Sequence, residues 1–222
     1  MKRSYVFPSF AVALMLFLFT SLAPAAHAAG AVHLTFVTHA AFFSQETHQT
    51  KPIDPQVFVR ETASPAATGP QGIHHVAGVR PALIDQDPKD SLLFTAGGKP
   101  LGFKLGQWLA AEGKVTITPK SDGTARVTAS FSKLRPGGHY SLFENHFDQK
   151  PIGFTPLDGA GTSNNFIADK DGNARIGLVA PKPLTHANAV LLVYHSDRKS
   201  HGKQRGQIGV NAHHQLIARI PG

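Results

Sequence analysis

The sequence predicts an all-β protein: an antiparallel β-sandwich of about seven to nine strands, with Greek-key-like connections and one short helix near residues 104–112. Three observations predict this class. Residues 207–220 alternate between apolar and polar side chains with period two. Residues 187–194 form an apolar run of strand length. Two Asp-Gly pairs, at 122–123 and 171–172, are typical of hairpin turns.

Residues 1–28 have the pattern of a cleaved Sec-type signal peptide. The positive start Met1-Lys2-Arg3 precedes an apolar stretch from Phe10 to Phe19, and Ala26-His27-Ala28 supplies the small residues of a cleavage site near Ala28. The apolar stretch is too short for a membrane span, which needs about 20 residues. We therefore expect residues 29–222 to form a single exported β domain, soluble and either periplasmic or secreted, with no transmembrane segment.

Composition restricts the chemistry and the partners. The chain has no cysteine, so disulfides, thiolate metal ligands and a thiol nucleophile are excluded. The formal net charge is +8, and removal of Lys2 and Arg3 would leave +6 (8 − 2). This excess favours an anionic partner such as a glycan, an envelope surface or a protein. Nucleic acid is disfavoured, because the chain lacks basic-aromatic interleaving and any known nucleic-acid-binding motif.

The first half of the expected mature chain is less regular than the second. Residues 31–38 alternate and predict a first strand. Residues 44–70 are rich in Thr, Pro, Gln and Ala, and we expect them to be mostly irregular. Short strands are expected at 72–79 and 91–95. The best-defined part of the domain is residues 101–222.

A short helix is predicted just before Gly113. Leu101, Leu105, Trp108 and Leu109 recur at helical spacing, and a glycine is a common helix stop. The spacing places Trp108 on the apolar face of this helix. We expect Trp108 to pack in the core rather than to serve as a ligand platform.

The Asp-Gly pairs predict two hairpins with three-residue loops. The apolar faces of residues 115–117 and 125–129 match only if the loop between them has an odd length. A loop of residues 121–123 meets this condition and gives Gly123 the left-handed position of the turn. The same argument pairs residues 166–168 with 174–178 around a loop of residues 170–172.

The last third of the chain contains the stretch with the most chemistry. Residues 187–194 predict a central strand covered on both faces, and residues 207–220 predict a return strand with one face on the core. If His195 pairs with Gln207, Asn188 falls opposite His214. We then expect the ring of His214 to be buried and bonded to Asn188, and His213 to be solvated.

In this register the histidines divide into two groups. The tip group is His195 and His201, and the base group is His186 and His214. Six strand residues separate His195 from His214, which is roughly 20 Å. One metal ion would therefore not be shared between the two groups.

The cationic loop Ser196–Gly206 gives the first functional hypothesis. It has four cationic side chains and one carboxylate, and its neutral interpretation is a solvated hairpin end. Guanidinium and ammonium groups also bind anions. We interpret the protein as a binding or interaction module whose site is this loop, with residues 151–165 beside it. The candidate anion- or partner-binding residues are Arg198, Lys199, Lys203 and Arg205.

The second hypothesis is a copper or zinc site, because the chain contains 13 histidines. Imidazole suits both metals, and the absence of thiolates removes softer sites. The preferred ligands are His195, His201 and Asp197, and the alternative pair is His186 and His214. The competing interpretation is that these histidines are structural.

A hydrolase is the third and weakest hypothesis. Ser196 lies between His195 and Asp197 in the sequence, but successive side chains of a strand diverge. The chain also lacks a Gly-x-Ser-x-Gly motif. We therefore assign no catalytic residue, and the sequence favours a protein that is not an enzyme.

Overall fold

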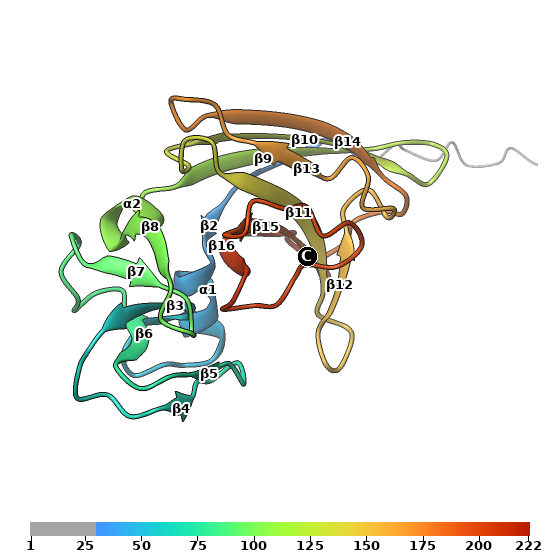
Figure 1. Ribbon diagram of the computed structural model, residues 1–222. Coiled ribbons are helices and arrows are strands. Elements are labelled where there is room, and N and C mark those ends of the chain that lie inside the picture. The colour runs from blue at the N-terminus through green and yellow to red at the C-terminus, as the bar shows by residue number, and fades with distance from the viewer. Residues whose placement is uncertain (1–29) are drawn as a thin grey trace, which may run out of the picture.

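A computed structural model of the chain describes residues 30–222 (Figure 1). The predicted signal peptide and its cleavage site lie outside the described residues. The fold is all-β and antiparallel, which confirms the predicted sandwich class. Within residues 30–222, no helix combines the length and the apolar character needed to cross a membrane.

Two sheets form the sandwich. The outer sheet has the strand order β1-β9-β10-β14, and the central sheet has the order β12-β11-β15-β16-β2, with β13 also paired to β11. The strands of the outer sheet are β1 Val32–Thr35, β9 Glu112–Pro119, β10 Ala125–Ser132 and β14 Ala174–Ala180. Those of the central sheet are β2 Val37–Thr38, β11 His139–His146, β12 Gly153–Pro156, β13 Asn165–Ile167, β15 Asn188–His195 and β16 Ala212–Arg219.

A smaller side sheet with the order β6-β3-β7-β8 and a two-stranded pair β4-β5 lie to one side of the sandwich (Figure 1). Their bounds are β3 Ile53–Arg60, β4 Ala67–Thr68, β5 His74–His75, β6 Val79–Leu83, β7 Leu92–Phe94 and β8 Pro100–Lys104. Two helices, α1 His39–Glu46 and α2 Leu105–Leu109, complete the described residues. The strands in residues 30–222 therefore outnumber the seven to nine expected, because several have only two to five residues.

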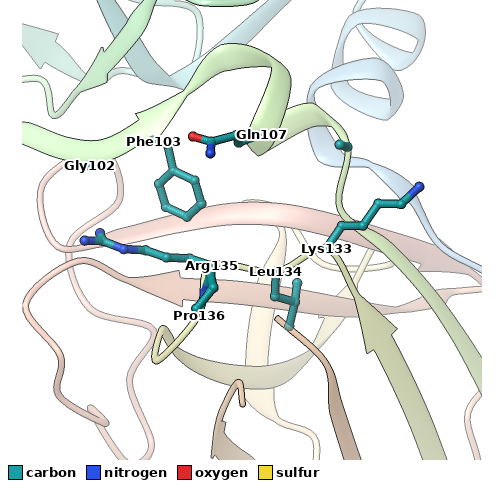
Figure 2. A pocket seen from close by; sticks show the side chains of 8 residues that line it. Gly102, Phe103, Gln107, Lys133, Leu134, Arg135 and Pro136 are labelled. Carbon is teal, nitrogen blue, oxygen red and sulfur yellow. The ribbon is translucent and has the colours of Figure 1, made fainter. Parts of the chain in front are cut away.

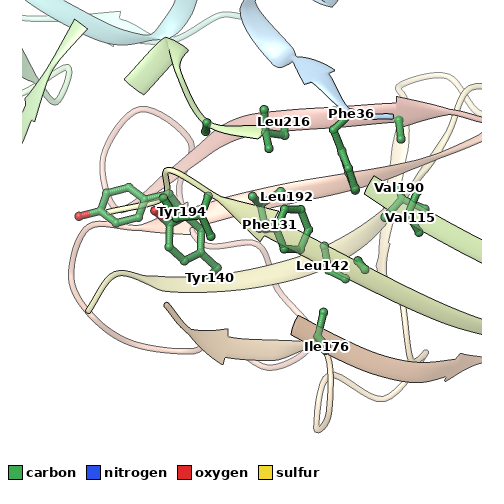
Figure 3. Packing of buried hydrophobic residues seen from close by; sticks show 14 of the residues in the cluster. Phe36, Val115, Phe131, Tyr140, Leu142, Ile176, Val190, Leu192, Tyr194 and Leu216 are labelled. Atoms are coloured by element: carbon green, nitrogen blue, oxygen red, sulfur yellow. The ribbon is translucent and has the colours of Figure 1, made fainter. Parts of the chain in front are cut away.

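The main core lies between the outer and central sheets (Figure 3). Val115 and Phe131 of the outer sheet face Leu142 and Leu192 of the central sheet, and all four are at most 4% exposed. Trp108 of α2 is 1% exposed, which confirms both the short helix and its core packing. Apolar burial of this kind supplies most of the favourable free energy of folding.

The central sheet is also covered on its second face. All eight residues of β15 are buried, and β11 and β16 flank it, so the predicted central strand is confirmed. Leu191 and Ile217 belong to a second apolar cluster on the face opposite the main core. Three partly buried rings, from α1, β12 and the segment after β11, pack against this cluster: Phe42, Phe154 and Phe147.

The predicted register of the last hairpin is wrong. His195 pairs with Ala212 rather than Gln207, and His214 pairs with Val193. A bulge at Leu192/Val193 shifts the register. Because a one-residue shift moves side chains to the other face, the one-faced alternation predicted for 207–220 is also wrong.

The bulge residue is Gln215. After it, Leu216 pairs with Leu192 in the main core, whereas before it His214 pairs with Val193 on the second face. His213 is consequently buried rather than solvated, and Ile217, which interrupts the alternation, reaches the second apolar cluster.

The hairpin predicted around Asp122-Gly123 is confirmed. Of the hairpin predicted around Asp171-Gly172, only the turn is confirmed. Ala125 pairs with Pro119, and Gly123 has a φ of +79°. Gly172 also adopts a positive φ, +76°. The strands that flank it nevertheless separate, because β13 pairs with β11 and β14 pairs with β10. The turn therefore connects the two sheets and does not close a hairpin.

Residues 44–70 are more regular than expected. β3 occupies residues 53–60, and its central six residues are buried. The preceding strand prediction, residues 31–38, corresponds to two short strands in different sheets, β1 and β2, joined at the buried Phe36. The chain then enters α1, whose first turn is capped by the Thr38 hydroxyl accepting from the Ala41 N–H at 3.3 Å. The sequence analysis did not predict α1.

Candidate functional site

A cavity of about 670 Å³ lies on the second face of the central sheet. It is bounded by α1, the β11–β12 connection, β12 and the loop before β16. This volume is within the range of small-molecule sites. Most of its lining is aromatic or aliphatic, and the main apolar residues are Phe42, Phe147, Ile152, Phe154 and Ile208.

The polar part of the cavity wall includes the cluster of His39, His214 and Arg205, and the other polar residues of the lining are Glu46, Thr47, Gln71 and Asn145. His39 comes from the start of α1, His214 from β16 just before the bulge, and Arg205 from the preceding loop. The two imidazole rings meet edge to face with centroids 4.8 Å apart. Arg205 Nη1 lies 2.8 Å from His214 Nε2.

The side chain of Gln56, on β3, determines which nitrogen of His214 accepts. The backbone N–H of His214 donates to Gln56 Oε1 at 2.7 Å, so the other end of this amide is the donor Nε2. Gln56 Nε2 lies 3.0 Å from His214 Nδ1. Nδ1 must therefore accept, and a neutral His214 carries its proton on Nε2. Burial lowers the pKa of His214 well below its ordinary value, which keeps the ring neutral at pH 7.

Two donors consequently face each other in the wall of the cavity. The Nε2–H of His214 points to the Arg205 guanidinium, whose N–H groups can only donate. No acceptor from the described residues is recorded for either His214 Nε2 or Arg205 Nη1. Buried donors without an acceptor are rare in proteins and destabilising. An anionic oxygen beside the pair would accept from both.

Arg205 is held in place by an aromatic ring. Its guanidinium carbon lies 3.3 Å from the centroid of Phe154, so the planar group lies on the ring face. Burial lowers the pKa of Arg205 from its ordinary value to about 10, and no carboxylate among the described residues counteracts this. Within residues 30–222, Arg205 forms no ion pair. The guanidinium is therefore a preorganised, half-buried positive charge.

Asp54 of β3 fixes the backbone segment that carries Gln56. Its carboxylate accepts from the backbone N–H of Gln56 at 2.9 Å and from Trp108 Nε1 at 2.8 Å. Asp54 is fully buried, and burial raises its pKa to about 6. These bonds hold the irregular stretch of β3 between Asp54 and Phe58, from which Gln56 reaches His214.

His39 adds a second neutral imidazole. Burial, assisted by the positive charge of Arg205, lowers the pKa of His39 to about 3. His39 Nε2 lies 3.4 Å from His214 Nδ1, and since Nδ1 accepts, His39 Nε2 is the donor. His39 Nδ1 is then a buried lone pair that has no partner among the described residues.

The four predicted cations do not converge. Arg198, Lys199 and Lys203 are exposed on the loop surface, and only Arg205 enters a cavity. The predicted neighbour, residues 151–165, does reach this loop. A Cβ on Gly161 would lie 2.3 Å from the carbonyl carbon of Gly202, so the two loops are in backbone contact.

The preferred metal ligands are neighbours without metal-binding geometry. His201 Nε2 lies 3.1 Å from Asp197 Oδ2, and the His195 and His201 ring centroids are 5.2 Å apart. His195 Nε2 is 2.8 Å from Ser141 Oγ, and its buried Nδ1 has no partner among the described residues. Across residues 30–222, no group of three or more His, Asp or Glu side chains is arranged to hold a metal ion. The copper or zinc hypothesis stays a prediction.

The alternative pair, His186 and His214, is separated by the length of β15. His214 pairs with Val193, whereas His186 precedes β15 and lies beside Gly222. The strand steps from Asn188 to Val193 alone correspond to roughly 17 Å, and His186 lies in the turn before Asn188, so one ion does not reach both histidines. His214 contacts Gln56, His39 and Arg205, not Asn188 as expected. The division into tip and base groups was wrong, because the bulged register places His214 two residues from Ala212, the partner of His195.

A second cavity, of about 380 Å³, also contains an arginine (Figure 2). Arg135 extends beside the Phe103 ring under Gly102. Its Nη1 donates to the Leu101 carbonyl and to the Tyr194 hydroxyl, at 2.7 Å for the latter. These acceptors satisfy Nη1 and connect β8 to the sandwich, so Arg135 has a structural role that Arg205 lacks.

No protein-family model and no curated protein matches this chain. The chemistry of the cavity therefore carries the functional argument alone. Sequence reasoning identified Arg205 and His214 but assigned them to separate sites, and it missed His39, Gln56 and Phe154. The available signal was the apolar pattern around residues 57–59, which would have placed Gln56 on a buried strand.

Proposed function

We propose that this chain is an exported binding protein that captures an anionic partner beside Arg205 and His214. The observation that carries the proposal is the pair of facing donors, His214 Nε2–H and the Arg205 guanidinium, 2.8 Å apart without an acceptor. A carboxylate or a similar oxyanion supplies two acceptor oxygens and one negative charge. It would satisfy both donors and compensate the half-buried guanidinium.

Export is supported by residues 1–28, whose positive start, apolar stretch and small cleavage residues match a signal peptide. In a periplasmic or extracellular setting the protein would meet its partner outside the cytoplasm. The intact mass of protein recovered from the cell envelope or the medium tests this part. We expect a chain that begins at residue 29, and an uncleaved chain in the cytoplasm would contradict it.

Sodium acetate is the simplest probe of anion capture. We expect acetate, at constant ionic strength against sodium chloride, to shift the imidazole ¹⁵N resonances of His214 in the wild-type protein. The Arg205→Met variant should show no such shift, because it lacks the charge that holds the anion. The matched control is Arg198→Met, which removes an exposed cation of the same loop and should respond as the wild type does.

A surface interaction is the competing form of the anion hypothesis. The triple variant Arg198→Gln/Lys199→Gln/Lys203→Gln removes the exposed charges and keeps Arg205. If retention on a heparin column depends on these three residues, and acetate leaves His214 unchanged, the anion is bound on the loop surface and the proposed cavity site is wrong.

A further inference from the structure

We propose that the captured anion is the head of a small monocarboxylate with an apolar body, and that this body occupies the 670 Å³ cavity beside Arg205. This inference rests on the proposed function and deepens it. It specifies the class of ligand, whereas the proposed function by itself would also be consistent with an inorganic anion.

The lining of the cavity argues for the apolar body. Phe42, Phe147 and Phe154 pack on the second apolar cluster yet remain only partly buried, so each ring still presents surface to the cavity. Ile152, on the β11–β12 connection, lines the same space and is 45% exposed. An inorganic ion would leave this apolar surface in water, whereas an alkyl or aryl group would cover it.

The charges of the cavity argue for a single negative charge. Two cationic side chains are near it. Arg219 lies over the Phe147 ring, with its guanidinium carbon 4.7 Å from the centroid, and pairs with Glu46 at 3.3 Å. Arg205 has no carboxylate partner among the described residues, and His39 and His214 are neutral. The site therefore holds one uncompensated positive charge, which matches a monoanion better than a polyanion.

The size of the cavity argues for a free small molecule. A volume of about 670 Å³ is typical of sites that enclose drug-sized ligands. Arg205 anchors the head beside Phe154, and the apolar residues accommodate a body of limited length. A folded macromolecule or a long polyanion does not fit within this space.

The test is calorimetric titration with a series of straight-chain carboxylates, from butanoate to dodecanoate, each below its micellar concentration, with 1-octanol as the uncharged match of octanoate. We expect the affinity to rise about fourfold for each added methylene, the ratio that corresponds to ~0.8 kcal/mol per buried CH₂. The rise should stop at the length that fills the cavity. Octanol should bind at least about tenfold more weakly, because it lacks the charge-assisted bonds.

Two variants separate the head from the body. Arg205→Met should remove the preference for octanoate over octanol. Ile152→Asn adds a polar group to the cavity wall at a half-exposed position. This variant should weaken the dependence of affinity on chain length while the acetate response at His214 persists. The matched control is Ile167→Asn, a 60% exposed isoleucine of β13 outside the cavity lining, which should behave as the wild type.

The outcomes are distinct. An affinity that does not depend on chain length, with acetate still shifting His214, overturns the apolar body and leaves anion capture standing. Octanol that binds as tightly as octanoate, in the wild type and in Arg205→Met alike, overturns both. A chain-length series that rises, levels off and becomes shallower in Ile152→Asn supports the inference.

Discussion

Replacing Arg205 by methionine should stabilise the ligand-free protein. Burial lowers the pKa of Arg205 from the ordinary value of an unfolded chain to about 10. At pH 7 the group is below both values and is charged in the folded and unfolded states, so the whole destabilisation is present. It decreases only as the pH rises above about 10. At ~1.36 kcal/mol per pKa unit, the upper bound is ~3 kcal/mol.

Two effects reduce this number. Part of the guanidinium contacts solvent, which screens its charge and lowers the destabilisation to ~1–2 kcal/mol. The stacking on Phe154 contributes ~0.5–1 kcal/mol in the other direction, and a methionine sulfur retains some of it. The net expectation is a variant more stable by ~1 kcal/mol, or about 2–4 °C in Tm for a domain of this size.

The assay is thermal or urea unfolding followed by the fluorescence of Trp108, with and without octanoate. Without ligand, Arg205→Met should unfold at the higher temperature. With octanoate in excess the order should reverse, because only the wild type gains RT ln(1 + [L]/Kd) from the bound anion. Arg198→Met should stay within ~0.5 kcal/mol of the wild type under both conditions. A ligand-free Arg205→Met that is less stable than the wild type by 1 kcal/mol or more would refute the reasoning, since Arg205 would then be a structural partner of His214.

Three further predictions follow from other parts of the structure. Burial lowers the pKa of His39 to about 3 and that of His213 to about 4, so both rings stay neutral in the folded protein. Because the same residues bind protons below pH 6.5 in the unfolded chain, the free energy of unfolding should fall by ~2 kcal/mol for each histidine between pH 6.5 and 4.5. Urea unfolding at each pH measures this. Gly161→Ala should destabilise the protein by several kcal/mol more than Gly123→Ala, because both glycines have a positive φ but only Gly161 lies against backbone, as paired thermal melts would show. The copper or zinc hypothesis predicts that either metal raises the Tm of the wild type and not of His195→Ala.

Each of these has an outcome that contradicts it. Stability that does not change down to pH 4.5 would mean that the buried histidines are already charged. Asp54, with its raised pKa, gains stability as the pH falls from 6 and offsets part of the histidine effect, so Asp54→Asn should steepen the loss. Equal effects at Gly161 and Gly123 would deny the contact between the two loops. A protein recovered without metal, and without a Tm shift on metal addition, would leave the histidines structural.

The sequence predicts the sandwich class well where local chemistry determines it. The Asp122-Gly123 turn follows from face matching over a few residues, and the pairing of Ala125 with Pro119 confirms it. Residues 187–194 are a central strand because their apolar side chains have to be covered on both faces. Both predictions depend on neighbours in the sequence.

Predictions that needed long-range contacts were wrong. The second Asp-Gly turn has the expected geometry at Gly172, but its strands pair with β10 and β11 instead of with each other. β3 was missed because its proline and polar residues resemble a loop. Asp54 and Gln56 are buried there since Trp108 and His214, far along the chain, supply their hydrogen-bond partners.

The candidate site depends on one residue that periodicity does not reveal. Without the bulge at Gln215, the register of Leu216 with Leu192 would place His214 opposite Tyr194. Its side chain would then point into the main core and away from Arg205. The additional residue turns His214 to the second face, next to α1 and the cationic loop. There it meets a donor, Arg205, at hydrogen-bond distance. Two donors that face each other without an acceptor among the described residues destabilise the folded chain. The proposed anion would supply the missing acceptor and remove this destabilisation. The bulge that made the sequence prediction fail is therefore also what brings the residues of the proposed binding site together.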